Sequence, residues 1–124
     1  MSDITLDTGA LIALERRRQR MATLWRYARI RRIPISVPAA VITEWWRGRT
    51  DRRADILAGV DVEPLDDALA RLAGEALAAT PGATAVDAMV MASAARKGNV
   101  VYTSDVDDLS RLQRFFPGIR VFGV

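Results

Sequence analysis

Residues 3–7 read Asp-Ile-Thr-Leu-Asp, and residues 8–14 continue as Thr-Gly-Ala-Leu-Ile-Ala-Leu. The first segment alternates polar and apolar side chains, which is the two-residue period of a β-strand. The second segment is an almost unbroken apolar run and predicts a helix directly after the strand. A strand that ends in an acid and leads straight into a helix is typical of the first unit of an α/β fold.

Similar units follow along the rest of the chain. We expect further strands at 35–37, 60–65, 99–103 and 119–122, and further helices at 19–32, 38–46, 50–58, 67–79, 84–97 and 105–115. Pro34, the turn at 80–82 and Gly98 mark boundaries between them. Strands separated by helices form a parallel sheet covered on both faces, because parallel strands need crossover connections. We therefore predict a three-layer α/β fold in which residues 1–124 form a single domain.

The composition excludes several chemistries. The 124 residues include no Cys and no His, which rules out a disulfide framework, a thiolate nucleophile, a His general base and the usual zinc sites. Any catalysis must come from carboxylates, hydroxyls, amines or a bound cofactor. Half of the residues are apolar, enough for one core of ordinary size. No secretory signal and no apolar run of about 18 residues is present, so we expect a cytoplasmic protein.

Basic residues concentrate in one part of the sequence. The net charge is +3, but residues 16–53 hold twelve Arg against only Glu44 and Asp51, a local balance of +10. In the helix expected at 19–32, apolar residues recur on one face and Arg fills much of the other. This distribution favours binding of a polyanion such as a nucleic acid, although a solvated Arg-rich surface would give the same pattern.

Four carboxylates stand out by their position. Asp7 and Asp105 each end a predicted strand and precede a helix, where an N-cap residue is equally expected. Asp87 is the only charge in residues 83–95, where it also completes a capping box with Thr84. Glu44 lies among apolar neighbours, unlike a residue on a solvated helix face. Ligands of parallel α/β sheets bind beyond the carboxyl ends of the strands, near the point where strand order reverses. We expect the four acids to converge at that edge.

A divalent cation would compensate the repulsion between these acids. Clustered oxygen ligands without imidazole or thiolate select hard ions such as Mg²⁺ or Mn²⁺. Beside an Arg-rich surface, such a site suggests hydrolysis of a phosphodiester bond, in which the metal activates water and stabilises the leaving oxygen. One metal ion or two would both fit the pattern.

The acids lie in four short segments with a characteristic order and spacing. The segments are residues 6–14, Leu-Asp-Thr-Gly-Ala-Leu-Ile-Ala-Leu; residues 41–44, Val-Ile-Thr-Glu; residues 86–92, Val-Asp-Ala-Met-Val-Met-Ala; and residues 101–109, Val-Tyr-Thr-Ser-Asp-Val-Asp-Asp-Leu. Together they resemble the PIN-domain ribonucleases, specifically the toxins of VapBC-type toxin–antitoxin pairs. The resemblance implies a sheet of order 3-2-1-4-5, a Mg²⁺ site formed by Asp7, Glu44, Asp87 and Asp105, and RNA as substrate. It also implies a cognate antitoxin as partner and a homodimer of the toxin.

Residues next to these acids have candidate supporting roles. Members of the family often carry a further acid just after the fourth. Both Asp107 and Asp108 could be that further acid. We favour Asp108 as a structural residue at the start of the helix and treat Asp107 as a candidate outer ligand. The hydroxyls of Thr8, Thr103 and Ser104 could orient a carboxylate or a water, or serve in turns and caps.

The three tryptophans belong to the expected helices at 19–32 and 38–46. By the resemblance, these helices form an apolar groove for the C-terminal segment of the antitoxin. Plain core packing is the alternative. Adjacent residues on a helix point about 100° apart, so we expect one of Trp45 and Trp46 in the core and the other exposed.

Two other functions fit an α/β domain of this size. A phospho-receiver module would need a Lys after the fifth strand, whereas the one lysine, Lys97, precedes the expected fourth strand. A non-catalytic RNA-binding protein would keep the basic surface without metal-dependent cleavage. The leading hypothesis is a Mg²⁺-dependent endoribonuclease that cleaves RNA with metal-activated water and is held inactive by an antitoxin.

Overall fold

A parallel sheet of five strands forms the centre of the molecule. The computed structural model describes residues 3–124, and its strand order is β3-β2-β1-β4-β5. The strands are β1 (Ile4–Leu6), β2 (Ile35–Pro38), β3 (Asp61–Glu63), β4 (Val100–Thr103) and β5 (Arg120–Gly123). All four pairings are parallel. The predicted α/β class and the strand order 3-2-1-4-5 are confirmed.

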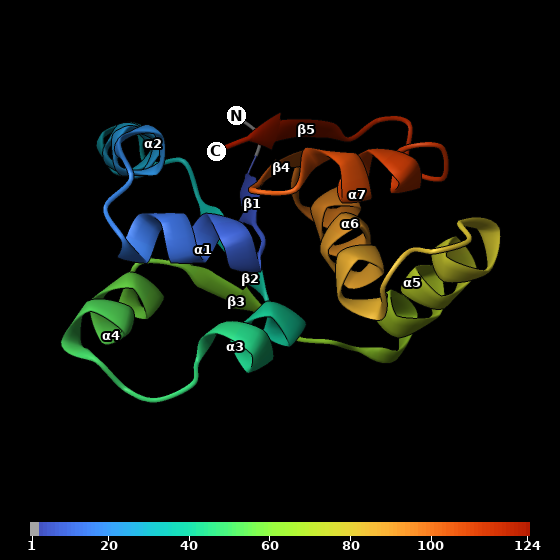
Figure 1. Cartoon of the computed structure of the whole chain (residues 1–124), viewed down its shortest axis with the longest axis horizontal. Helices are drawn as coiled ribbons and strands as arrows, with labels where there is room; N and C mark the ends of the chain where they lie inside the picture. Colours follow the sequence, from blue (N-terminus) through green and yellow to red (C-terminus); the bar gives the residue numbers. More distant parts are fainter. Residues whose placement is uncertain (1–2) are drawn as a thin grey trace.

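Helices cover both faces of this sheet. They are α1 (Thr8–Glu15), α2 (Gln19–Arg31), α3 (Ala39–Trp45), α4 (Asp51–Ala58), α5 (Asp67–Ala79), α6 (Ala85–Lys97) and α7 (Val106–Leu112). Figure 1 shows α1–α4 to one side of the strands and α5–α7 to the other, as right-handed crossovers in this strand order require. In the part of the chain that the structure describes, no helix combines the length and the apolar character needed to cross a bilayer.

Side-chain caps begin most of the helices at the predicted places. Asp7, Thr50, Asp66, Thr84 and Asp105 each accept a hydrogen bond from the backbone N–H three residues later. Two segments are shorter than predicted. The strand expected at 60–65 spans only 61–63, because its partner β2 ends at the residue paired with Glu63. The helix expected at 105–115 ends at Leu112, where a turn begins that leads to Pro117.

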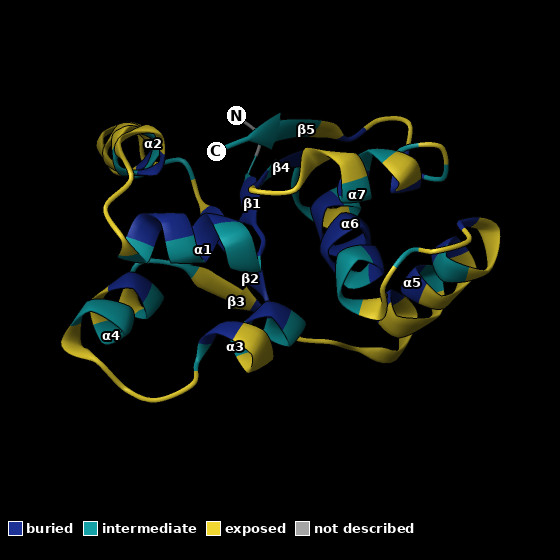
Figure 2. Ribbon diagram, viewed as in Figure 1, coloured by how far each residue is buried: buried dark blue, intermediate teal, exposed yellow. Residues whose placement is uncertain are grey.

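The core lies between the sheet and the inner helices. Strand β1 is buried throughout, and six of the 13 residues of α6 are buried, including Val90 and Met91. Figure 2 shows this contrast, with α6 and β1 mostly dark and the outer faces of α2 and α5 exposed. Helix α1 contributes Leu11 and Leu14 to the same core. Burial of these apolar faces holds the loops after β1 and β4 in fixed positions at one edge of the sheet.

Candidate functional site

Asp7 and Asp105 follow the two strands that lie side by side at the centre of the sheet. Strand order reverses here, since β1 pairs with β2 on one side and with β4 on the other. The buried Asp7 carboxylate accepts a hydrogen bond from the Ala10 N–H at 2.9 Å and another from the Thr103 hydroxyl. The Thr103 oxygen in turn accepts from the Asp105 N–H at 2.9 Å. One threonine therefore ties both strand ends together, as expected of a hydroxyl that orients a carboxylate.

Asp7 occupies an environment that disfavours its charge. Burial raises its pKa, and the negative charges of Asp87 and Asp105 raise it further. The hydrogen bonds from Thr103 and Ala10 oppose that rise without cancelling it. Asp7 is thus held rigidly in place by donors while it remains electrostatically unsatisfied.

Asp87 approaches the same point from the first turn of α6. The Thr84 hydroxyl caps the helix by accepting from the Asp87 N–H at 3.2 Å, so the predicted cap exists. The side chain is half-buried, and burial is the largest cause of its raised pKa. The charges of Asp108, Asp105 and Glu44 raise the pKa further. Asp87 is therefore the residue that links the acids from α3, α6 and α7 electrostatically.

Asp108 belongs to the same acidic group, although we expected it to serve mainly at the start of the helix. It lies in the first turn of α7, as predicted, and its N–H donates to Asp105 Oδ1 at 3.4 Å. A hydrogen bond shared between the two carboxyl groups raises the pKa of Asp105 and lowers that of Asp108, which Arg111 also contacts at 2.8 Å. The spacing of three residues between an N-cap and an acid in the first turn could have revealed this pair. Asp107 is exposed, and its charge adds to the rise of the Asp105 pKa.

Glu44 lies at the rim of the group. It is exposed on α3, so the expectation from its apolar neighbours is wrong: Val41 and Trp45 turn inward and leave Glu44 on the outer face. The Thr8 hydroxyl donates to Glu44 Oε1 at 2.5 Å, which orients the carboxylate from the first turn of α1. Ser104 makes a different contact, since its side chain packs close to Gly9.

The chemistry of these acids suits a hard cation. Among residues 3–124, no Lys or Arg lies within 4.0 Å of the carboxylates of the four predicted ligands, Asp7, Glu44, Asp87 and Asp105. In the same residues, no three acids are arranged closely enough to form a ready-made metal site. The donors are all oxygens, and a bound divalent ion would relieve the repulsion that contributes to the raised pKa values of Asp7, Asp87 and Asp105.

A hollow of about 350 Å³ opens beside Glu44. It is lined by Thr8, Ile12 and Trp45, by the acids Glu15 and Glu44, and by the arginines Arg16, Arg47 and Arg53. The Arg-rich stretch thus reaches the acidic group, but only some of its members are free to bind. Arg53 donates to Glu15 Oε2 at 3.0 Å and to the Gly48 carbonyl at 2.8 Å, while Arg52 donates to the Leu14 carbonyl at 2.9 Å.

The expectation for the tryptophans is correct for Trp45 but not for Trp46, which packs against the core instead of being exposed. Trp45 is buried and donates its indole N–H to Glu15 at 2.9 Å. Trp46, the residue after α3, is half-buried and packs edge-on against it. Trp25 fills space between α2 and Gly59. The Arg29 guanidinium carbon lies 5.6 Å from the centroid of its ring.

Comparisons with known proteins agree with this geometry. The chain resembles the VapBC2 complex of Rickettsia felis, solved bound to a DNA fragment from its promoter, with a TM-score of 0.75 and 9% identity over 98% of each chain. It also resembles the DNA-bound VapBC of Salmonella typhimurium, with a TM-score of 0.74 and 18% identity over 99% of this chain and 98% of the other. No curated protein matches the sequence significantly. Residues 4–114 match the PIN domain family, and the chain therefore belongs to that family.

Proposed function

We propose that this protein is a Mg²⁺- or Mn²⁺-dependent endoribonuclease and the toxin of a type II toxin–antitoxin pair. One observation carries the proposal. In a PIN-family fold, Asp7 and Asp105 follow the two strands at the reversal point of the sheet, and the charges of Asp87, Asp105 and Glu44 raise the pKa of Asp7 or of Asp87, while none of the four has a basic partner among the described residues. The family match also favours this function over a phospho-receiver module.

Asp7, Glu44, Asp87 and Asp105 would hold the cation. When bound, the metal would polarise water for attack on phosphorus and stabilise charge on the leaving oxygen. Thr103 keeps Asp7 and the Asp105 backbone in register, and Thr8 keeps Glu44 turned toward the group. These hydroxyls supply the positional order that catalysis on a held substrate requires.

RNA is the proposed substrate because the basic surface reaches the acidic group. Arg16 and Arg47 line the hollow that also contains Glu44, so a phosphate chain gripped there would pass beside the carboxylates. The choice of ribose over deoxyribose rests on the resemblance to PIN-domain toxins. A non-catalytic RNA-binding protein would need the same arginines but no unpaired acids.

A cognate antitoxin is the proposed protein partner. Two solved structures similar to this chain are described as VapBC complexes. The hollow next to Glu44 combines apolar Ile12 and Trp45 with arginines, which suits an amphipathic segment of a partner. A homodimer is proposed as well, since α2 exposes Tyr27 and Ile30, the latter at 73%.

The test is cleavage of RNA by variants of the four acids. Asp7→Asn, Glu44→Gln, Asp87→Asn and Asp105→Asn should each lower the rate of RNA cleavage at least about 100-fold in Mg²⁺, because each removes a charge from the ligand set. Asp67→Asn, an exposed acid of α5 paired with Arg71, is the matched control and should cleave like the parent. Mapping the ends of total RNA after incubation with and without Mg²⁺ gives the readout.

Two outcomes would contradict the proposal. If Asp87→Asn cleaved RNA at the parent rate, Asp87 would not belong to the site. If the parent bound RNA but cleaved nothing in Mg²⁺ or Mn²⁺, the non-catalytic RNA-binding function would replace the nuclease.

A further inference from the structure

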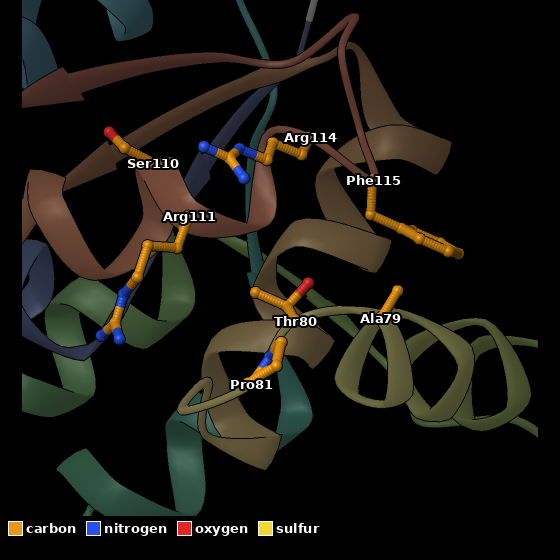
Figure 3. Close-up of a pocket in the computed structure, with 7 residues that line it drawn as sticks. All are labelled: Ala79, Thr80, Pro81, Ser110, Arg111, Arg114 and Phe115. Carbon is orange, nitrogen blue, oxygen red and sulfur yellow. The ribbon is translucent and has the colours of Figure 1, made fainter.

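A second hollow lies on the other side of the acidic group, between the α5–α6 turn and the end of α7. Its volume is about 500 Å³, within the range of sites for small ligands. Figure 3 shows Thr80 and Pro81 on the turn facing Arg111, Arg114 and Phe115. No part of the proposed metal site lines it.

The walls of this hollow have the chemistry of a nucleotide site. Two guanidinium groups and the Ser110 hydroxyl contribute donors, and no carboxylate lines the hollow. Phe115 is half-buried and forms an aromatic wall of the hollow. Its ring packs edge-on against that of Phe116, with the two ring centroids 4.9 Å apart. Phosphate is recognised by arginine and nucleobases by aromatic faces.

Arg111 connects this hollow to the acids. Its guanidinium contacts Asp108 Oδ1 at 2.8 Å, and the Asp108 N–H contacts Asp105 at 3.4 Å. The turn is shaped to fit it, since a Cβ on Gly82 would lie 3.0 Å from Arg111 Nη1 and Gly82 has a φ of 84°. Arg114, by contrast, has no ion-pair partner among residues 3–124. One side chain is thus committed to the acidic group and the next is free for a ligand.

We propose that this hollow binds the nucleotide that flanks the cleaved bond, with its phosphate on Arg114 and its base against Phe115. The proposal rests on the proposed ribonuclease function, since a strand whose scissile phosphate lies at Asp87 and Asp105 continues past Asp108 into the hollow. Together with the hollow beside Glu44, it would give the enzyme contacts on both sides of the cut.

Titration of the chelated protein with uridine 5′-monophosphate or inorganic phosphate, followed by amide NMR, tests the site without catalysis. In the parent, the nucleotide should shift the amides of residues 79–81 and 110–115. Arg114→Gln should weaken this binding about tenfold, because a charge-assisted contact is lost, while Arg114→Lys should recover part of it. Arg71→Gln, an equal loss of charge at an exposed position two turns away on α5, should bind like the parent.

A cleavage series with oligoribonucleotides of increasing length gives the second readout. Arg114→Gln should raise KM about tenfold for long oligonucleotides and leave kcat within about twofold, whereas substrates too short to reach the hollow should be unaffected. Equal nucleotide binding and equal KM in Arg114→Gln and the parent would overturn the proposal. If phosphate alone reproduced every shift at the same affinity, the base contact with Phe115 would be overturned.

The two proposals can fail separately. Nucleotide binding that depends on Arg114 in a parent protein that cleaves no RNA would retain the site and reject the ribonuclease. Metal-dependent cleavage that is unaffected by Arg114→Gln at every length, without nucleotide shifts, would retain the ribonuclease and reject the site.

Discussion

Asp7 and Asp66 both cap a helix, but their surroundings shift their pKa values in opposite directions. Asp7 caps α1 and Asp66 caps α5, each by accepting an N–H three residues on at 2.8–2.9 Å. Asp66 also pairs with Arg96 at 2.9 Å, and these hydrogen bonds lower its pKa to about 2. Asp7 is buried near other acids, and its pKa is raised. Capping therefore explains where both residues are, but only Asp66 is stabilised as a charge.

We expect the corresponding amides to change stability in opposite directions at pH 7 in chelator. The raised pKa of Asp7 means that the native state holds its proton more tightly than the unfolded state, so the ionised carboxylate opposes folding above that pKa. Asp7→Asn should therefore raise Tm, and this gain should shrink as the pH falls through the raised pKa. Asp66→Asn should lower Tm, because Asp66 contributes stability above its unfolded pKa that is lost as the pH falls toward about 2.

Thermal melts of the parent and both variants between pH 3 and pH 7 would measure this. A loss of Tm at pH 7 in Asp7→Asn as large as in Asp66→Asn would mean that Asp7 serves mainly as a helix cap. In added Mg²⁺ the parent should have the higher Tm and Asp7→Asn the lower, because the ion stabilises only the protein that keeps the Asp7 charge.

At the scale of elements, α1 and the loop after β4 approach too closely for any side chain but glycine. A Cβ on Gly9 would lie 1.8 Å from the Ser104 hydroxyl and 2.7 Å from its Cβ. Ser104 directly precedes Asp105, and Gly9 lies two residues after Asp7. The close spacing of Asp7 and Asp105 thus depends on Gly9 having no side chain.

Gly9→Ala should destabilise the fold by about 1–3 kcal/mol, the usual effect of overpacking, and lower RNA cleavage by displacing Asp105. Gly74→Ala is the matched control, because Gly74 also lies inside a helix but has open space around it. There alanine should stabilise by up to about 1 kcal/mol. Urea unfolding and cleavage rates measure both effects. Equal stability changes in the two variants would show that the loop at Ser104 can move to accommodate the new Cβ at no cost in stability.

The sequence was sufficient for the elements and their order but not for all features of the site. Caps such as Thr84 and breakers such as Gly98 act locally, so the helix ends could be predicted. Glu44 was misjudged because exposure depends on which face of α3 meets the core. The pairing of Asp108 with Asp105 is local, since the two residues lie three apart at the start of α7, but from the sequence we favour Asp108 only as a structural residue at the helix start. The free guanidinium of Arg114 depends on how the end of α7 lies against the α5–α6 turn, which local patterns do not contain.

For the whole molecule, the sheet separates a basic side from a mixed one. Residues 16–53 carry twelve arginines and span α2–α4, all on the α1 side of the strands. Some of them hold the fold together, as Arg52 and Arg53 do. Arg16 and Arg47 line the hollow with Glu44, as Arg53 also does, and Arg47 Nε donates to the Glu44 carbonyl at 3.0 Å. The RNA-binding capacity of this side should therefore rest on a subset of its arginines.

The salt dependence of RNA binding tests that division. With Asp87→Asn protein in Ca²⁺, the logarithm of the affinity should fall linearly with the logarithm of salt concentration. Each of Arg16→Gln and Arg47→Gln should reduce that slope by roughly 0.7 for single-stranded RNA. Arg120→Gln, at the exposed first residue of β5, should leave it unchanged. An unaltered slope in the Arg16 and Arg47 double variant would assign these residues to the antitoxin or to a solvated surface.

Because of where the tryptophans lie, intrinsic fluorescence can report binding on only one side of the sheet. All three indoles belong to α2, α3 or the residue after α3, and Trp45 lines the hollow next to Glu44. Intrinsic fluorescence should therefore respond when a ligand or partner enters that hollow and perturbs the emission of Trp45 and its neighbour Trp46. The hollow lined by Phe115 contains no indole. A molecule bound only there would not change the tryptophan fluorescence. Fluorescence and amide NMR together would therefore tell which side of the sheet a ligand occupies.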